Sequence, residues 1–113
     1  MSTMHAWLTG EYTPTILLIS GANRGLGKGL VERYLARDGH TVIAAVRDPN
    51  HPTSRDLADL PKGQHSRLVV VKIDSTAEAD ASKAVEELSA QGIGRLDLVI
   101  ANAAYAPSKA AVH

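Results

Sequence analysis

The sequence contains no cysteine, which excludes disulfide bridges and thiolate metal sites. Its five histidines form no His-x-x-x-His pair, so we expect no zinc site. Twelve basic residues balance twelve acidic ones, which gives no electrostatic reason to expect a nucleic acid or an anionic membrane as partner. No apolar run approaches the roughly 20 residues that span a bilayer, and we see no secretory signal. We therefore expect a cytoplasmic protein, and 113 residues allow one domain at most.

The stretch Thr15–Leu30 organises the chain. Its apolar run Ile16–Ile19 ends in three glycines and passes directly into a pattern of helical period, which predicts a strand, a tight turn and a helix. Glycine permits a positive φ angle and leaves no Cβ in the way of a ligand, while the helix points its unpaired N–H groups at the turn. We expect a dinucleotide pyrophosphate there, and the alternative is an ordinary strand-to-helix turn. The residues expected to hold the cofactor are Gly21, Asn23, Arg24, Gly25, Leu26 and Gly27.

Further apolar runs predict three more strands, at residues 41–46, 68–73 and 96–101, and helical stripes lie between them. Residues 54–60 could form a short helix. A capping box at Ser75 and Glu78 opens the last helix, and Gly92 closes it. The alternation of strand and helix predicts an α/β fold with a parallel sheet and right-handed crossovers. The apolar stripe is predicted to contain Leu26, Leu30, Val31, Tyr34 and Leu35 in the first helix, and Ala77, Ala81, Ala84, Val85 and Leu88 in the last.

Three residues near the predicted strand ends complete the expected cofactor site. Arg47 follows the second strand, where dinucleotide folds read the ribose 2′ position, and an arginine there suits a 2′-phosphate. With Arg24 nearby, this favours NADP(H) over NAD(H), unless Arg47 merely pairs with Asp48 or solvent. Asp74 is expected at the adenine edge, although Asp74 or Ser75 would also serve as a helix cap. Asn102 follows the fourth strand, where its amide can tie strands together beside the cofactor.

Tyr105 and Lys109 stand four positions apart, a spacing that puts both on one face of a helix. A lysine charge close by favours the phenolate and lowers a tyrosine pKa from its usual value of about 10. The tyrosine then becomes a usable proton donor to a carbonyl near neutral pH. On its own, this spacing more often marks a surface helix.

Taken together, the motifs Gly21-Ala-Asn-Arg-Gly-Leu-Gly27, Asp74, Asn102-Ala-Ala and Tyr105-Ala-Pro-Ser-Lys109 resemble the short-chain dehydrogenase/reductase family. Within the family, the motifs Gly21-Ala-Asn-Arg-Gly-Leu-Gly27 and Val46-Arg-Asp-Pro49 are similar to those of fungal ketoreductases of the norsolorinic acid ketoreductase type, for which we expect an aromatic polyketide as substrate. The resemblance implies a partial Rossmann domain over residues 15–113 with strand order 3-2-1-4, after a flexible extension at 1–14. It also implies hydride transfer between a nicotinamide and a small-molecule ketone or alcohol. Tyr105 would be the acid/base, and Lys109 would lower its pKa and bind the nicotinamide ribose.

The chain departs from that family pattern at its end. In the family, a helix and a strand carrying a serine separate the Asn-Ala-Gly motif from the tyrosine, whereas Asn102 and Tyr105 are almost adjacent here. Ala104 stands where the family has glycine, and no residue fits the serine's role. Either an internal segment is missing, or the chain is truncated and the tyrosine motif is a chance match. We expect an incomplete catalytic site on both accounts, so the alternative function is an inactive nucleotide-binding fragment. A homo-oligomer is compatible with the complete fold.

Overall fold

The computed structural model describes residues 14–74 and 78–102. Its elements in chain order are β1 Thr15–Ser20, α2 Gly25–Leu35, β2 His40–Val46, α3 Pro52–Arg55, the 3-10 helix η1 Asp56–Asp59, β3 Arg67–Lys72, α4 Glu78–Ala90 and β4 Leu98–Ile100. All strand pairs are parallel, and the order is β3-β2-β1-β4. The predicted α/β class and strand order are therefore confirmed. Residues 1–13 of the predicted extension lie outside the described part.

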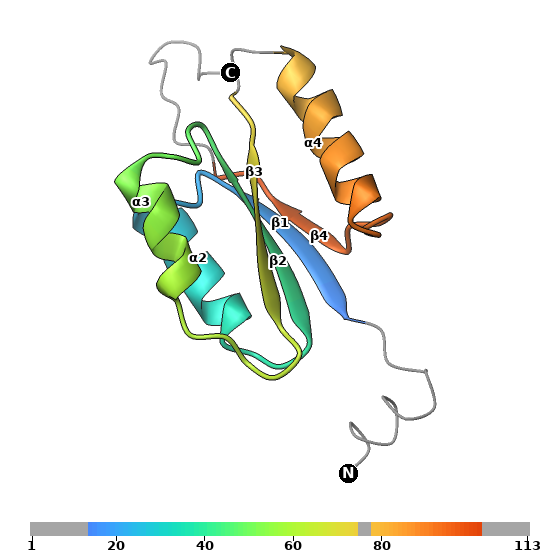
Figure 1. The fold of residues 1–113 in the computed structure, drawn as a ribbon. Helices are drawn as coiled ribbons and strands as arrows, with labels where there is room; N and C mark the ends of the chain where they lie inside the picture. Colours follow the sequence, from blue (N-terminus) through green and yellow to red (C-terminus); the bar gives the residue numbers. More distant parts are fainter. Residues whose placement is uncertain (1–13, 75–77, 103–113) are drawn as a thin grey trace.

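The sheet lies between two helical layers. Helices α2 and α3 cover one face and α4 covers the other (Figure 1). The reason is the direction of the crossovers: the chain steps from β1 to β2 to β3 one way and then returns across the sheet to β4. Right-handed connections running in opposite directions place their helices on opposite faces. None of the helices in the described ranges is long and apolar enough to cross a membrane.

Strand β2 is the centre of the core because both of its faces are covered. Its residues from Thr41 to Val46 are all buried. Leu17, Val42 and Leu35 belong to the cluster on the α2 side, and Ile43 and Leu88 belong to the cluster on the α4 side. The first three strands start and end within one residue of the predicted runs. Strand β4 is shorter than predicted and contains only three residues.

Helix α2 differs from the sequence prediction at its first turn. Leu26 is 70% exposed, so its place in the predicted buried stripe is wrong. Val31 and Leu35 are fully buried, and Leu30 and Tyr34 pack partly buried against them. The physical reason is that Gly27, and not Leu26, occupies the side of the first turn that contacts the domain. The side chain of Leu26 is therefore directed to solvent or to a ligand.

Helix α4 buries Ala84 and Leu88 as predicted, but Val85 is 61% exposed and Ala81 is also exposed. The predicted stripe was too wide, because the helix lies on the sheet along one row of residues spaced four apart. Its end at Gly92 is confirmed: the Ile93 N–H donates to the Leu88 carbonyl, and the Gly92 N–H donates to the Ser89 carbonyl. Gly92 has a φ of 83°, as a Schellman cap requires. Residues 75–77, including Ser75 of the capping box and Ala77, lie outside the described ranges.

Asp97 fastens the start of β4 to β1. Its Oδ2 accepts the Ile16 N–H at 2.8 Å, and its own N–H donates to the Ile16 carbonyl at 2.7 Å. The Arg95 Nε donates to Oδ1 at 3.2 Å. The Ile16 backbone bond, followed by the Arg95 side-chain bond, lowers the pKa of Asp97 below its ordinary 3.8. Both interactions stabilise the ionised carboxylate.

Replacing Asp97 should change how stability depends on acid. Because the folded-state pKa lies below the unfolded one, the carboxylate stabilises the fold above pH 3.8, and this contribution is lost as the pH falls through the folded pKa. We expect Asp97→Asn to be less stable than the parent chain at neutral pH and the difference to shrink below pH 3.8. Urea unfolding at neutral and acidic pH measures it. A difference that is the same at both pH values would contradict this role of the carboxylate.

Candidate functional site

The residues predicted to form the site follow the carboxyl ends of all four strands. Gly21 comes directly after β1 and Arg47 after β2, while Asp74 and Asn102 each stand two residues beyond the ends of β3 and β4. Parallel strands bring these positions to one edge of the sheet, the upper edge in Figure 1. This is the edge at which open parallel α/β sheets bind their ligands.

Gly27 lies where helix α2 packs tightly against the turn after β1 and the residues after β4. A Cβ built on Gly27 would lie 2.1 Å from the Gly21 carbonyl oxygen and 2.7 Å from Nδ2 of Asn102. No side chain fits in that space, so the turn after β1, the first turn of α2 and the end of β4 pack together through this glycine. Gly21, Gly27 and Asn102 are all predicted from the sequence to bind the cofactor, and the fold brings them together.

The backbone around Gly25 is open to a ligand. Gly21 and Gly25 have φ angles of 59° and 57°, which side-chain-bearing residues rarely adopt. A Cβ at Gly25 would meet no atom within 4 Å. The turn is therefore tightly packed on its Gly27 side and unobstructed on its Gly25 side, where a phosphate could approach the main chain.

Among residues 14–74 and 78–102, no side chain caps the N-terminus of α2. Arg24, the residue before the helix, has an extended backbone and makes no side-chain capping hydrogen bond, and the first turn contains no acidic residue. The first N–H groups of a helix have no partner within it and form the positive end of the helix dipole. Arg24 itself is exposed. This end of the helix is suited to an anion.

Two hydrogen bonds hold the glycine turn against its neighbours. The Ala22 N–H donates to the Ala45 carbonyl of β2 at 3.4 Å, and Asn23 Nδ2 donates to Thr53 Oγ1 of α3 at 2.7 Å. The same Thr53 Oγ1 lies 2.9 Å from His51 Nδ1, within hydrogen-bond distance. The Asn23 amide nitrogen is therefore engaged with α3. No sequence signal pointed to Thr53 or His51, because their link to the turn exists only in the folded chain.

Asn102 is fixed by the end of β1. Its backbone N–H donates to Ser20 Oγ at 2.8 Å. The two strands are thus joined at their carboxyl ends, as predicted, but through the Asn102 main chain and the Ser20 hydroxyl. Ser20 was not among the predicted site residues. A polar residue at the end of an apolar strand, directly before Gly21, is nevertheless a signal that could have indicated its role.

Arg47 is exposed at the end of β2. Its neighbour Asp48 uses Oδ1 to accept the Asn50 N–H at 3.0 Å. Within the described ranges, the ion pairs are Lys72 with Asp80 and Arg95 with Asp97, so the alternative that Arg47 pairs with Asp48 gains no support. The guanidinium is available at the position where we expect a ribose 2′ group.

The connection after β3 is held by a residue that the sequence analysis missed. Asp80, which is only 7% exposed, accepts the Asp74 N–H on Oδ2 at 2.9 Å, and Lys72 Nζ lies 3.9 Å from the same oxygen. The carboxylate thereby fixes the backbone at Asp74. A signal was present, because Asp80 stands four residues before Ala84 and eight before Leu88, on the buried row of α4. Ser75, the other predicted cap, lies outside the described residues.

The two predicted catalytic residues, Tyr105 and Lys109, lie outside the described residues, as does Ala104. Their roles therefore stay predictions.

The family model that matches this chain and two of its curated relatives are described as short-chain dehydrogenases or ketoreductases. The family model described as short chain dehydrogenase matches residues 15–113. A norsolorinic acid ketoreductase of Dothistroma septosporum is 50% identical over 98 residues, which are 86% of this chain and 36% of that protein. A short chain dehydrogenase of Penicillium aethiopicum is 48% identical over 90 residues, 80% of this chain and 35% of that protein. The chain thus spans about a third of the length of the curated relatives it matches.

Solved structures share the fold. An NADPH-bound carbonyl reductase from chicken fatty liver superimposes with a TM-score of 0.68 at 30% sequence identity, covering 84% of this chain and 36% of that one. A carbonyl reductase of Caenorhabditis elegans described as Sniffer gives a TM-score of 0.65 at 25% identity, covering 80% and 37%.

Proposed function

This chain belongs to the short-chain dehydrogenase family, and from that premise we propose that it binds NADP(H) and carries the cofactor-binding part of a ketoreductase. The observation that carries the proposal is the packing at Gly27, where a Cβ would lie 2.1 Å from the Gly21 carbonyl oxygen. A dinucleotide-binding turn uses a glycine at this point for close packing of helix on strand.

The residues at the carboxyl edge fit such a cofactor. The uncapped first turn of α2 supplies N–H donors for a pyrophosphate, and the open side of Gly25 gives it access to the main chain. Leu26 is exposed beside these groups and offers an apolar contact. Asp74 follows β3, at the place proposed for the adenine. When bound, the nicotinamide would supply or accept a hydride.

Preference for NADP(H) over NAD(H) rests on Arg47. The exposed guanidinium at the end of β2, which forms no ion pair with the other described residues, offers bidentate donors to a 2′-phosphate, while an acidic residue there would accept bonds from a 2′-hydroxyl. Arg24 adds a second exposed cation to the same edge. The carbonyl reductase from chicken fatty liver was solved with NADPH bound, which is consistent with this preference.

For catalysis, we propose that Tyr105 donates the proton to the substrate carbonyl and that Lys109 lowers its pKa and binds the nicotinamide ribose. The substrate class is a small-molecule ketone or the corresponding alcohol, in keeping with the ketoreductase names of the relatives. In the sequence, no serine stands between Asn102 and Tyr105 to bind the developing oxyanion, and such a donor is often worth about 3 kcal/mol. A second candidate function is therefore nucleotide binding without turnover, favoured by the near adjacency of Asn102 and Tyr105, which the family pattern separates by a helix and a strand carrying the serine.

An NADPH-consumption assay with a panel of ketones and quinones separates these functions. We expect saturable NADPH binding to the purified chain with turnover close to the background, because no serine between Asn102 and Tyr105 can act as the oxyanion donor. Turnover at a rate typical of enzymes, about 10 per second, would show that this chain is a working ketoreductase and would contradict the view that its site is incomplete. Absence of NADPH binding would contradict the proposal as a whole.

A further inference from the structure

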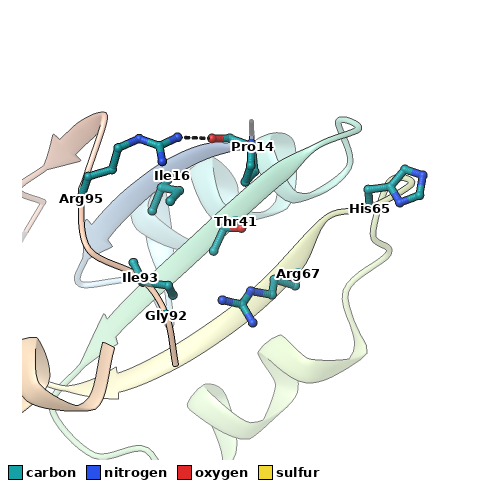
Figure 2. Close-up of a pocket in the computed structure, with 8 residues that line it drawn as sticks. All are labelled: Pro14, Ile16, Thr41, His65, Arg67, Gly92, Ile93 and Arg95. Atoms are coloured by element: carbon teal, nitrogen blue, oxygen red, sulfur yellow. Dashed lines mark hydrogen bonds between the residues drawn. The ribbon is translucent and has the colours of Figure 1, made fainter. Parts of the chain in front are cut away.

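A hollow of about 410 Å³ lies at the amino-terminal edge of the sheet, opposite the glycine turn. Figure 2 shows its lining. Part of this lining is a row across three strands, since Ile16 of β1 is the register partner of Thr41 of β2, which is the partner of Arg67 of β3. Such partners stand side by side on one face, about 4.8 Å apart from strand to strand. We call this hollow the amino-edge pocket.

The pocket is open because α4 covers only the next row of the same face. Ile43 and Val69, one row further along, are buried in the cluster that contains Leu88 and Ile93. After α4 the chain turns at Gly92, and Ile93 and Arg95 border the pocket where the chain runs towards β4. None of the helices in the described part of the chain therefore covers the row of Ile16, Thr41 and Arg67 completely.

The lining is basic although the chain as a whole has zero net charge. Two arginines and His65 line the pocket, and no acidic residue does. Arg95 is engaged, since its Nη2 donates to the Pro14 carbonyl at 2.7 Å and its Nε to Asp97. Arg67 forms none of the ion pairs found in the described part of the chain. Its side chain runs from β3 towards Gly92 and Ile93, whereas His65 stands apart at one end (Figure 2).

Thr41 supplies a second hydrogen-bonding group to the pocket. The residue is only 5% exposed and lines the pocket. Its hydroxyl takes part in none of the side-chain hydrogen bonds within residues 14–74 and 78–102. In the described part of the chain, the fully buried side-chain polar atom without a partner is Ser54 Oγ, so the Thr41 hydroxyl is accessible from the pocket and available to donate to a ligand there.

We propose that the amino-edge pocket binds the carboxylate of a small molecule with a compact apolar body. The Arg67 guanidinium holds the two carboxylate oxygens, and the Thr41 hydroxyl donates a further hydrogen bond. The apolar body contacts Ile16 and Ile93. The volume is within the range of about 300–1,000 Å³ usual for small-molecule sites. This site is separate from the cofactor site and does not depend on the proposed function.

The donors favour a carboxylate over a phosphate. One guanidinium matches the planar, two-oxygen geometry of a carboxylate, while a phosphate dianion presents more oxygens than Arg67 and Thr41 can satisfy. Ile16 and Ile93 are only 6% and 5% exposed, so they present a small apolar floor to the pocket. This floor gives a compact apolar ring or short alkyl chain next to the carboxylate a limited apolar contact.

Titration of the isotope-labelled full-length chain with benzoate, followed by two-dimensional amide NMR, tests this proposal. We expect saturable shifts at Ile16, Thr41 and Ile93 and none at Gly25 of the glycine turn. Arg67→Gln should weaken benzoate binding by about tenfold or more, because it removes the charge-assisted pair. Thr41→Val, which keeps the shape of the side chain, should weaken it by a smaller factor. Arg33→Gln, a change at an exposed arginine of α2, is the matched control and should leave binding unchanged.

Two further probes define the chemistry of the site. Benzamide lacks the charge and inorganic phosphate lacks the apolar body, so both should bind at least about tenfold more weakly than benzoate. The proposal is overturned if benzoate produces no saturable shifts, if Arg67→Gln binds it as well as the parent chain, or if phosphate binds equally. A spectrum without dispersed peaks would also contradict it, because the pocket exists only when β1, β2 and β3 are paired.

Discussion

Gly27→Ala is expected to abolish cofactor binding and to destabilise the domain, although it adds a single methyl group. The new Cβ would lie 2.1 Å from the Gly21 carbonyl oxygen and 2.7 Å from Asn102 Nδ2, and the carbonyl belongs to the backbone of the turn itself. Helix α2 must therefore move away from the turn, which displaces the N–H groups proposed to bind the pyrophosphate. Overpacking of this kind costs about 1–3 kcal/mol. Urea unfolding and NADPH titration measure the two effects.

Two neighbouring glycines provide matched controls. A Cβ at Gly29 would meet nothing within 4 Å, and Gly29 lies inside α2, so Gly29→Ala should stabilise the chain by about 0.5–1 kcal/mol. Gly25 has equal space but a φ of 57°, so Gly25→Ala should destabilise through backbone strain alone, by about 1–2 kcal/mol. If Gly27→Ala proved as stable as Gly29→Ala and still bound NADPH, the close packing at Gly27 would have no functional meaning.

Arg47→Asp is expected to reverse the cofactor preference. The change removes the guanidinium proposed to pair with the 2′-phosphate and introduces a carboxylate that repels it. Loss of a hydrogen bond to a charged group costs about 1.5–3 kcal/mol, so NADPH should bind about tenfold to a hundredfold more weakly. NADH should bind as well as before or better, because the new carboxylate can accept from the 2′-hydroxyl.

The control for Arg47→Asp is Arg33→Asp, which makes the same change of charge on the exposed side of α2. It should leave the ratio of the two affinities unchanged. Isothermal titration of both variants with NADPH and NADH provides the measurement. An unchanged preference in Arg47→Asp would remove the basis for assigning NADP(H), while binding of both cofactors would still support the site at the glycine turn.

Much of the fold could be predicted because its signals are local. Uninterrupted apolar runs such as Val42–Val46 identify strands buried on both faces, and glycines with positive φ, such as Gly25 and Gly92, mark where helices begin and end. The strand order followed from the family resemblance and is confirmed by the register of the pairs.

Other features could not be predicted because they depend on contacts between distant segments. Periodicity gives a helix an apolar stripe but not its width, so Leu26 and Val85 were wrongly assigned to the interior. The bond from Asn102 to Ser20 joins residues 82 positions apart. The amino-edge pocket likewise depends on the register of three strands and on where α4 ends, neither of which a single segment encodes.

We propose that the turn between β1 and α2 binds an NADP(H) dinucleotide, and a thermal-unfolding titration tests this binding. NADPH and NADH are added separately to the purified chain, and the midpoint of thermal unfolding is followed. A ligand present at a hundred times its dissociation constant stabilises the folded state by about 2.7 kcal/mol. We therefore predict a saturable rise of the midpoint with NADPH and a smaller rise with NADH at the same concentration. A cooperative transition whose midpoint responds to neither cofactor would contradict the account.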